Sequence, residues 1–207
     1  MNCKAMHYNA RAAKADGKQL SAMDRIIMLR SNFTHSEFQF SKRYFNVSWS
    51  FTLADGADGS RFKMIKYSHP KRWESDVIYL SNAQEGILFL EACRLADTDE
   101  LNIAHYCIDY DKYIMNAIEQ GKNHWKYDTK GLLTHATKKS KKWWLNLIRQ
   151  FTWCWTKLIS PAKSKMWCSE GVGHLIKTCW HDFCKKPDEY DPEELSARIK
   201  KYFSKNL

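Results

Sequence analysis

The 207-residue sequence lacks any long apolar run. Its first twenty residues, MNCKAMHYNARAAKADGKQL, hold no apolar stretch of the kind that a secretory signal peptide carries. No segment of about 18 uncharged apolar residues occurs, and the most apolar segment, residues 143–159, is interrupted by Arg149 and Lys157. We therefore expect neither a signal peptide nor a transmembrane helix.

Paired metal-binding cysteines are also missing. The chain has seven Cys but no Cys-x-x-Cys pair, and free thiols in a reducing compartment are the expectation. The nearest approach to a metal site is Cys179 and Cys184, with His181 between them and His174 upstream. Zinc sites usually show two tight ligand pairs, so we expect no metal and no other cofactor.

Positive charge is in excess over the whole chain. Lys and Arg number 33 against 23 Asp and Glu, which gives a formal net charge of +10. Hydrophobic residues make up 44% and charged residues 27% of the sequence, which indicates a folded globular chain rather than a disordered one. The length favours one domain with room for a small subdomain. The charge favours an anionic partner of unspecified kind.

A basic, Trp-rich segment spans residues 138–166. It combines Lys and Arg with Trp143, Trp144, Trp153 and Trp155 and has no acidic residue. Such a segment can lie on an anionic membrane surface, or bind a cell-wall polymer or a nucleic acid. The alternative is an amphipathic helix whose Trp side chains pack on the domain. No helix-turn-helix, zinc-finger or RNP-type motif supports specific nucleic-acid recognition.

The first eighty residues change from a polar segment to a series of strands. Residues 1–20 are polar, without a clear period, and predict a tail or a loose helix. A short helix is expected over residues 22–30, with Ser21 as its N-cap. Stretches that are rich in aromatic and β-branched residues and bounded by turns predict strands; they cover residues 36–40, 44–51, 61–67 and 75–80. Their short connections favour an antiparallel meander.

Helical spacing takes over after Ser81. A helix is expected over residues 82–96, where Ile87, Leu90 and Leu95 recur at that spacing. Further helical stretches are expected over 99–120 and 126–136, and another helix after Cys168. The residues of that helix expected to be buried are Val172, Leu175, Ile176 and Cys179. A last helix over 191–203 opens with Asp191 as N-cap and Pro192 at its first position.

These patterns predict an α+β fold. A single domain is expected over residues 21–207, with a helical, basic insertion over about 82–165. The small antiparallel sheet is expected to pack against the helix that follows Cys168.

Cys168 is a candidate nucleophile because it lies where a loop turns into a helix. A helix N-terminus stabilises a thiolate and offers backbone N–H groups to an oxyanion. The alternative is an inert, buried cysteine. His35 is the best candidate for a general base. In a strand it projects from the same side as Glu37, which can orient the imidazole; the alternative is a surface His-Ser-Glu sequence at the start of a strand.

Several short motifs, in this order and spacing, resemble the permuted papain-like, NlpC/P60-related cysteine hydrolases, especially small phage-encoded members. Thr34-His35-Ser36-Glu37 resembles the Ser-His-Val-Glu of that family, and Trp167-Cys168-Ser169-Glu170 resembles its Phe-Cys-Ser-Glu. The remaining matches are Trp49-Ser50, Gly59-Ser60-Arg61-Phe62-Lys63, Trp73 with Asp76-Val77-Ile78, Tyr127-Asp128 with Gly131-Leu132, and the helix opening at Asp191. The resemblance spans roughly residues 22–200, and the histidine precedes the cysteine, as in the permuted group.

The resemblance implies a permuted papain-like fold and acyl transfer, with Cys168 as nucleophile and His35 as general base. The third member implied is Glu37, or a serine on the following strand, Ser48 or Ser50. The implied substrates are amides of peptidoglycan stem peptides, other peptides or lipid acyl groups, and the implied location is the host cytoplasm or the virion, among other phage proteins. Two alternatives stay open. One is an inactive virion or host-interaction protein that keeps the fold, and the other is a binder of anionic polymers.

Overall fold

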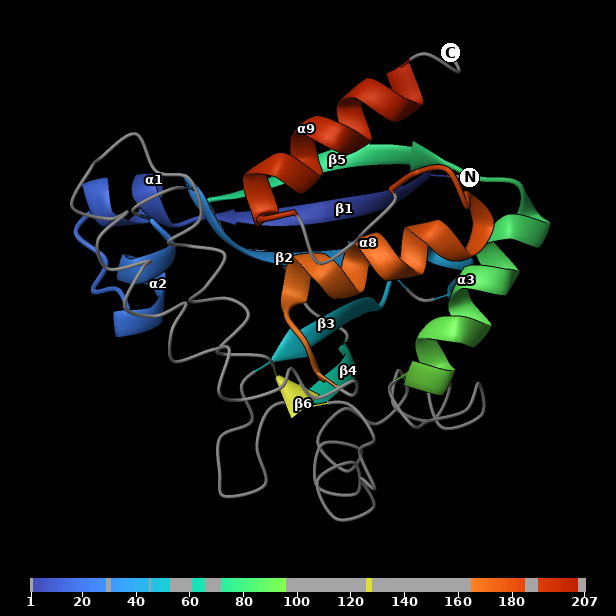
Figure 1. Ribbon diagram of the computed structural model, residues 1–207, viewed down its shortest axis with the longest axis horizontal. Helices are drawn as coiled ribbons and strands as arrows, with labels where there is room; N and C mark the ends of the chain where they lie inside the picture. Colours follow the sequence, from blue (N-terminus) through green and yellow to red (C-terminus); the bar gives the residue numbers. More distant parts are fainter. Residues whose placement is uncertain are drawn as a thin grey trace, which may run out of the picture.

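The computed structural model describes residues 2–28, 31–44, 46–52, 61–65, 72–95, 126–127, 165–184 and 190–204. These residues form a mixed α+β structure in which helices pack on one face of an antiparallel sheet (Figure 1). Helix α8 lies against β2 and β3, and α9 lies against β5, β1 and β2. The α+β prediction is therefore confirmed at the level of class.

The main sheet has five strands in the order β4-β3-β2-β1-β5, and each neighbouring pair is antiparallel. The strands are β1 Asn2–Asn9, β2 Phe33–Gln39, β3 Ser48–Thr52, β4 Arg61–Ile65 and β5 Trp73–Tyr79. All four predicted strands exist. The predicted meander is correct for β2, β3 and β4 but wrong for β5, which pairs with β1 at the opposite side of the sheet.

Strand β1 corrects the prediction of a polar tail over residues 1–20. Residues 2–9 form a strand with a partner on each side, and Ala10–Ala15 form α1. The Asn9 side chain caps α1 by accepting the Ala12 N–H at 2.9 Å. The buried side chains of β1 include Cys3, Ala5 and His7. They are small or polar, so β1 does not show the apolar alternation that usually marks a strand.

A second, two-stranded sheet pairs β6 (Lys126–Tyr127) with β7 (Lys165–Met166) in parallel. The prediction of a helix over 126–136 is therefore wrong for its first two residues. Other predictions lie outside the described residues: the helix over 99–120, the remainder of 126–136, and the basic segment 138–166 except for β7. Within the described part of the chain, no helix is long and apolar enough to cross a membrane.

The core lies between the sheet and helices α3 (Asn82–Leu95), α8 (Cys168–Cys179) and α9 (Pro192–Phe203). In α8, the buried residues Val172, Leu175 and Ile176 match the prediction. Each such side chain contributes about 1.5–3 kcal/mol through burial. In α3 the helix is confirmed, but Ile87 and Leu90 are exposed. Its buried side instead carries Glu85, Leu88, Phe89, Ala92, Cys93 and Leu95.

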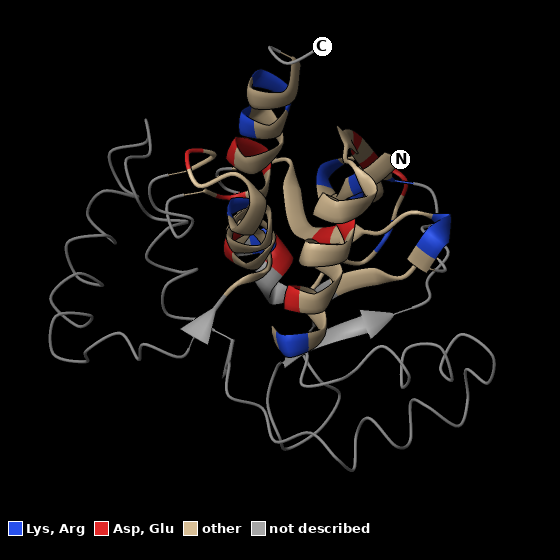
Figure 2. Ribbon diagram, turned by 90° about the vertical axis from the view of Figure 1, so that its right-hand side faces the viewer, with Lys and Arg blue, Asp and Glu red and all other residues tan. Residues whose placement is uncertain are grey.

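The ends of the short and the last helix follow their predicted caps. The Ser21 hydroxyl accepts the Asp24 N–H at 3.0 Å and so caps α2 (Ala22–Ile27). The Asp191 carboxylate accepts the Glu193 and Glu194 N–H groups at 2.9 and 2.8 Å. Helix α9 thus begins with acidic residues and ends with basic ones (Figure 2), which suits the helix dipole at both ends.

Candidate active site

Cys168 is the first residue of α8, as predicted. Trp167 precedes it in an extended conformation, and the Trp167 carbonyl accepts the Gly171 N–H at 2.9 Å as the first α-helical hydrogen bond. The Glu170 carboxylate turns back and accepts the Trp167 N–H at 3.3 Å. The N–H groups of the first turn find no carbonyl within their own helix. They form, together with the positive end of the helix dipole, a place where an anion is stabilised beside the sulfur.

The two residues on either side of Cys168 hydrogen-bond the same backbone carbonyl through their side chains. The Ser169 hydroxyl donates to the Tyr190 carbonyl at 2.8 Å, and the Trp167 indole N–H donates to the same oxygen at 3.4 Å. Tyr190 lies directly before the Asp191 cap of α9. The start of the cysteine helix is therefore anchored to the start of α9.

His35 lies on β2 and connects Cys168 with Glu37. Its imidazole hydrogen-bonds the Cys168 thiol, and its Nε2 lies 3.2 Å from Oε1 of Glu37. The prediction that His35 and Glu37 share one side of the strand is thereby confirmed. Because Nε2 faces the carboxylate, Nδ1 is the nitrogen left to take a proton from the thiol. The structure thus brings a thiol, an imidazole and a carboxylate together from α8 and β2, and a cysteine nucleophile with an oriented base needs these three groups.

The electrostatics of the imidazole follow from its two neighbours. Burial by itself lowers the pKa of His35, but the charge of Cys168 and the hydrogen bond to it raise this pKa more, and Glu37 adds to the increase. Together they raise the pKa of His35 from 6.5 to about 10. The raised pKa favours a protonated imidazole, which lies between the sulfur of Cys168 and the carboxylate of Glu37.

Aromatic residues that the sequence analysis did not assign to the site surround the imidazole. The Trp73 ring meets the His35 ring edge-on, with centroids 5.9 Å apart, and the Tyr8 ring lies 5.5 Å from Trp73. Tyr8 is the cross-strand partner of both His35 and Trp73. These contacts limit rotation of the imidazole, and no pattern along the sequence indicates them because they depend on the pairing of β1.

The serine candidates for the third member lie on β3. Ser50 is the cross-strand partner of Glu37, and Ser48 is the partner of Gln39. The side chain of Ser50 lies outside the described part of the structure, so its role stays a prediction. Glu37 is the candidate that contacts His35.

Cys168 and His35 differ in their exposure to solvent. Cys168 is 1% exposed and belongs to the main core cluster, whereas 25% of the His35 side chain is exposed. The imidazole is thus the accessible part of the pair.

A second histidine, His7, also lies among polar side chains. Its Nδ1 lies 3.0 Å from the Ser36 hydroxyl, and its Nε2 lies 3.2 Å from Oδ2 of Asp76. No sequence pattern indicates this setting, because both partners lie far from His7 along the chain. Among the residues that the structure describes, no group of three or more His, Cys, Asp or Glu side chains is placed to hold a metal ion.

Comparison of the chain with protein-family models, with curated proteins and with solved structures found no match.

Proposed function

We propose that this protein is a cysteine hydrolase that cleaves an amide through a Cys168–His35 acyl-enzyme mechanism, with Glu37 orienting the imidazole. The single observation that carries the proposal is the position of His35. Its ring is hydrogen-bonded to the thiol at the first residue of α8 and also contacts a carboxylate. Two of these side chains lie on β2 and the third lies more than 130 positions later, so the fold has to assemble them.

The first half of the reaction forms a thioester. The Cys168 thiolate attacks the carbonyl carbon, a sulfur–carbon bond forms, and the carbonyl π electrons move to the oxygen. The N–H groups in the first turn of α8 stabilise that oxyanion. When the intermediate collapses, the carbon–nitrogen bond breaks, and the leaving nitrogen takes a proton from the His35 imidazolium.

The second half regenerates the thiolate. The neutral imidazole of His35 takes a proton from a water molecule, whose oxygen attacks the thioester carbon. Collapse of this second intermediate expels the sulfur and leaves a carboxylic acid product. Glu37 stays ionised throughout and stabilises the imidazolium whenever it forms.

The fold and the substrate class of this proposal rest on the sequence motifs. The histidine strand precedes the cysteine helix along the chain, which agrees with a permuted papain-like fold. By the same resemblance, a phage origin and a stem-peptide amide of the bacterial cell wall are the proposed context and substrate. The basic segment 138–166 is the proposed contact with an anionic surface.

The test measures alkylation of Cys168 by iodoacetamide as a function of pH, read by peptide mass spectrometry. In the parent chain, rapid labelling is expected at pH 6, because the proposed mechanism pairs the sulfur with the His35 imidazolium. In His35→Ala, labelling at pH 6 is expected to fall to the rate of an ordinary thiol. Cys179, a half-buried thiol on the same helix, serves as the internal control. Labelling of Cys168 that is no faster than that of Cys179 and indifferent to His35 would sink the proposal.

The burial of the Cys168 sulfur favours a second candidate, a protein that keeps this fold but does not catalyse hydrolysis. A reactive Cys168 that releases no product from cell-wall peptides, in a protein present in stoichiometric copies in particles, would support it. Release of a peptide or an amine that disappears in Cys168→Ala would support the hydrolase.

A further inference from the structure

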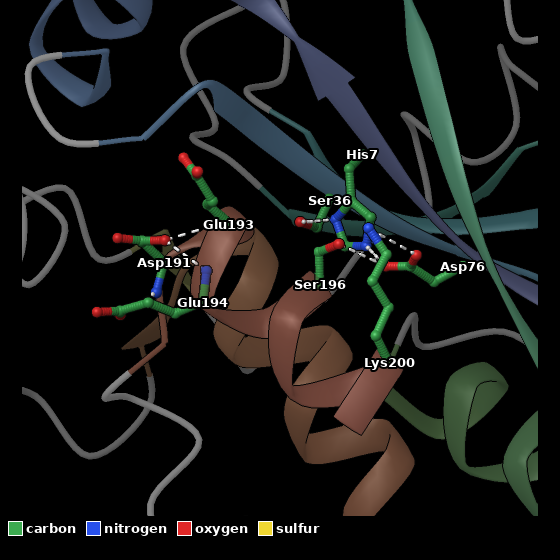
Figure 3. A network of polar contacts seen from close by, with 8 residues as sticks. All are labelled: His7, Ser36, Asp76, Asp191, Glu193, Glu194, Ser196 and Lys200. Carbon is green, nitrogen blue, oxygen red and sulfur yellow. Dashed lines mark hydrogen bonds and ion pairs between the residues drawn. The ribbon is translucent and has the colours of Figure 1, made fainter. Parts of the chain in front are cut away.

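A buried polar network connects three strands of the sheet to α9 (Figure 3). His7 of β1 lies between Ser36 of β2, at 3.0 Å from Nδ1, and Asp76 of β5, at 3.2 Å from Nε2. From α9, the Ser196 hydroxyl donates to Oδ2 of Asp76 at 2.6 Å, and the Lys200 ammonium lies 3.4 Å from Oδ1. His7 and Ser36 are at most 1% exposed.

The network is not a second catalytic centre, although it contains a serine, a histidine and an aspartate. Ser36 and the His7 beside it are both at most 1% exposed, whereas 25% of the His35 side chain beside Cys168 is exposed, so the network offers a substrate no exposed side chain of the kind that His35 provides. A buried group of this kind fixes the relative position of the elements that contribute to it.

We propose that His7 is a positioning residue that, through Ser36, sets the contact between His35 and Cys168; the inference rests on the proposed function. Ser36 stands between His35 and Glu37 in β2. His7 thus contacts the middle residue of this short segment from the neighbouring strand β1.

The backbone of β2 depends on this support near His35. Pairing with β3 runs only from Gln39 to Glu37. On the other side, the register with β1 is irregular between Tyr8 and Asn9, directly beyond the partner of His35. The ladder is therefore weakest at the strand segment that carries the base, and the Ser36–His7 contact secures it.

Helix α9 completes the connection to the nucleophile. It reaches the network through Ser196, and the Tyr190 carbonyl directly before its cap binds the Ser169 hydroxyl beside Cys168. Glu193 in its first turn also accepts the Asn32 N–H at 2.7 Å, directly before β2. One helix thus holds both the strand of the base and the start of the cysteine helix, so a change at His7 moves one relative to the other.

The test compares four variants of the full chain with the parent: Ser36→Ala, His7→Leu, His7→Gln and Arg198→Ala. Ser36→Ala removes one hydroxyl beside His35, and His7→Leu removes both polar contacts of the imidazole. His7→Gln can still donate to Asp76. The control is Arg198→Ala, because Arg198 ties α9 to the Phe183 carbonyl at 2.6 Å and takes no part in the network.

The quantity measured is the ratio of Cys168 alkylation by iodoacetamide at pH 6 to that at pH 9. A misplacement of about 1 Å can cost about a hundredfold in a reactive geometry; the expected fall in this ratio is about tenfold for Ser36→Ala and His7→Leu. His7→Gln should keep more of the ratio. Labelling of Cys93, a buried thiol on α3, measures general opening of the fold, which changes the rates at both pH values together.

Two results would overturn the inference. One is a parent-like ratio in Ser36→Ala, which carries the test even if His7→Leu fails to fold. The other is an equal fall in Arg198→Ala, which would assign the effect to a loosened α9. A parent chain whose Cys168 is not labelled at pH 6 would instead refute the proposed function.

Discussion

The Asp76 carboxylate allows the strongest stability prediction, because its partners differ in exposure. Replacing Asp76 by Ala removes the carboxylate beside the Nε2 of His7, whose side chain is only 1% exposed. The substitution leaves the buried imidazole and the Ser196 hydroxyl without this carboxylate at the same time, and each buried polar group that loses its partner costs about 1–3 kcal/mol. Ser196→Ala removes one hydrogen bond to a charged group, which costs about 1.5–3 kcal/mol. Lys200 is 63% exposed, and Lys200→Ala should cost no more than about 1 kcal/mol.

The effect of pH on Asp76 has a definite sign. Burial by itself raises the pKa of this carboxyl, but the hydrogen bonds from His7 and Ser196 and the charges of His7 and Lys200 outweigh burial, so the pKa lies below 3.8. A group whose pKa is lowered by folding contributes stability that is present above its unfolded pKa and is lost as the pH falls through the folded value. The difference in unfolding free energy between the parent and Asp76→Ala should therefore be full at pH 7 and shrink below about pH 3.8.

Urea unfolding followed by circular dichroism at pH 7 and pH 3 measures both effects. The expected order of cost is Asp76→Ala, then Ser196→Ala, then Lys200→Ala, with similar slopes against urea concentration. A cost for Lys200→Ala equal to that for Asp76→Ala would refute the reasoning, because solvent would then not be screening the lysine. If the difference in unfolding free energy between the parent and Asp76→Ala is the same at both pH values, folding does not lower the pKa of Asp76.

The remaining predictions concern the candidate site, a helix cap and the core. NMR titration should give His35 a pKa near 10 that falls in both Cys168→Ser and Glu37→Gln, and more in the former, because the sulfur contributes more to the increase. Asp191→Ala should cost about 1 kcal/mol in thermal unfolding, because two N–H groups of α9 lose their acceptor. Leu175→Ala, at a fully buried position, should cost about 2–5 kcal/mol in urea, and a cost below 1 kcal/mol would mean that α8 does not pack as described.

Local chemistry made much of the helical framework predictable. Asp191 followed by Pro192 marks the start of α9 because a carboxylate cap and a preset backbone angle act within one turn. The period-2 geometry of a strand likewise predicts the His35–Glu37 contact from their spacing alone. In both cases the interacting groups lie within a few residues of each other.

The remaining features depend on partners far apart in the sequence. His7 belongs to a polar stretch of the sequence, and its burial makes physical sense only once Ser36 and Asp76 lie beside its ring nitrogens. In α3, Ile87 is as apolar as Leu88, and the packing of α3 against α8 and the sheet decides that Leu88 is buried and Ile87 exposed. Aromatic contacts to His35 are unpredictable for the same reason, since Trp73 reaches it through the pairing with β1.

Strand β1 has a consequence for the order in which this chain can fold. It precedes every other described element, yet β5 joins the sheet only through it. Asp76 of β5 then finds Ser196, 120 positions further on. Contacts of such long sequence separation form slowly. During synthesis on a ribosome, one edge of β1 therefore stays unpaired until β5 emerges, and Asp76 waits longer still for Ser196.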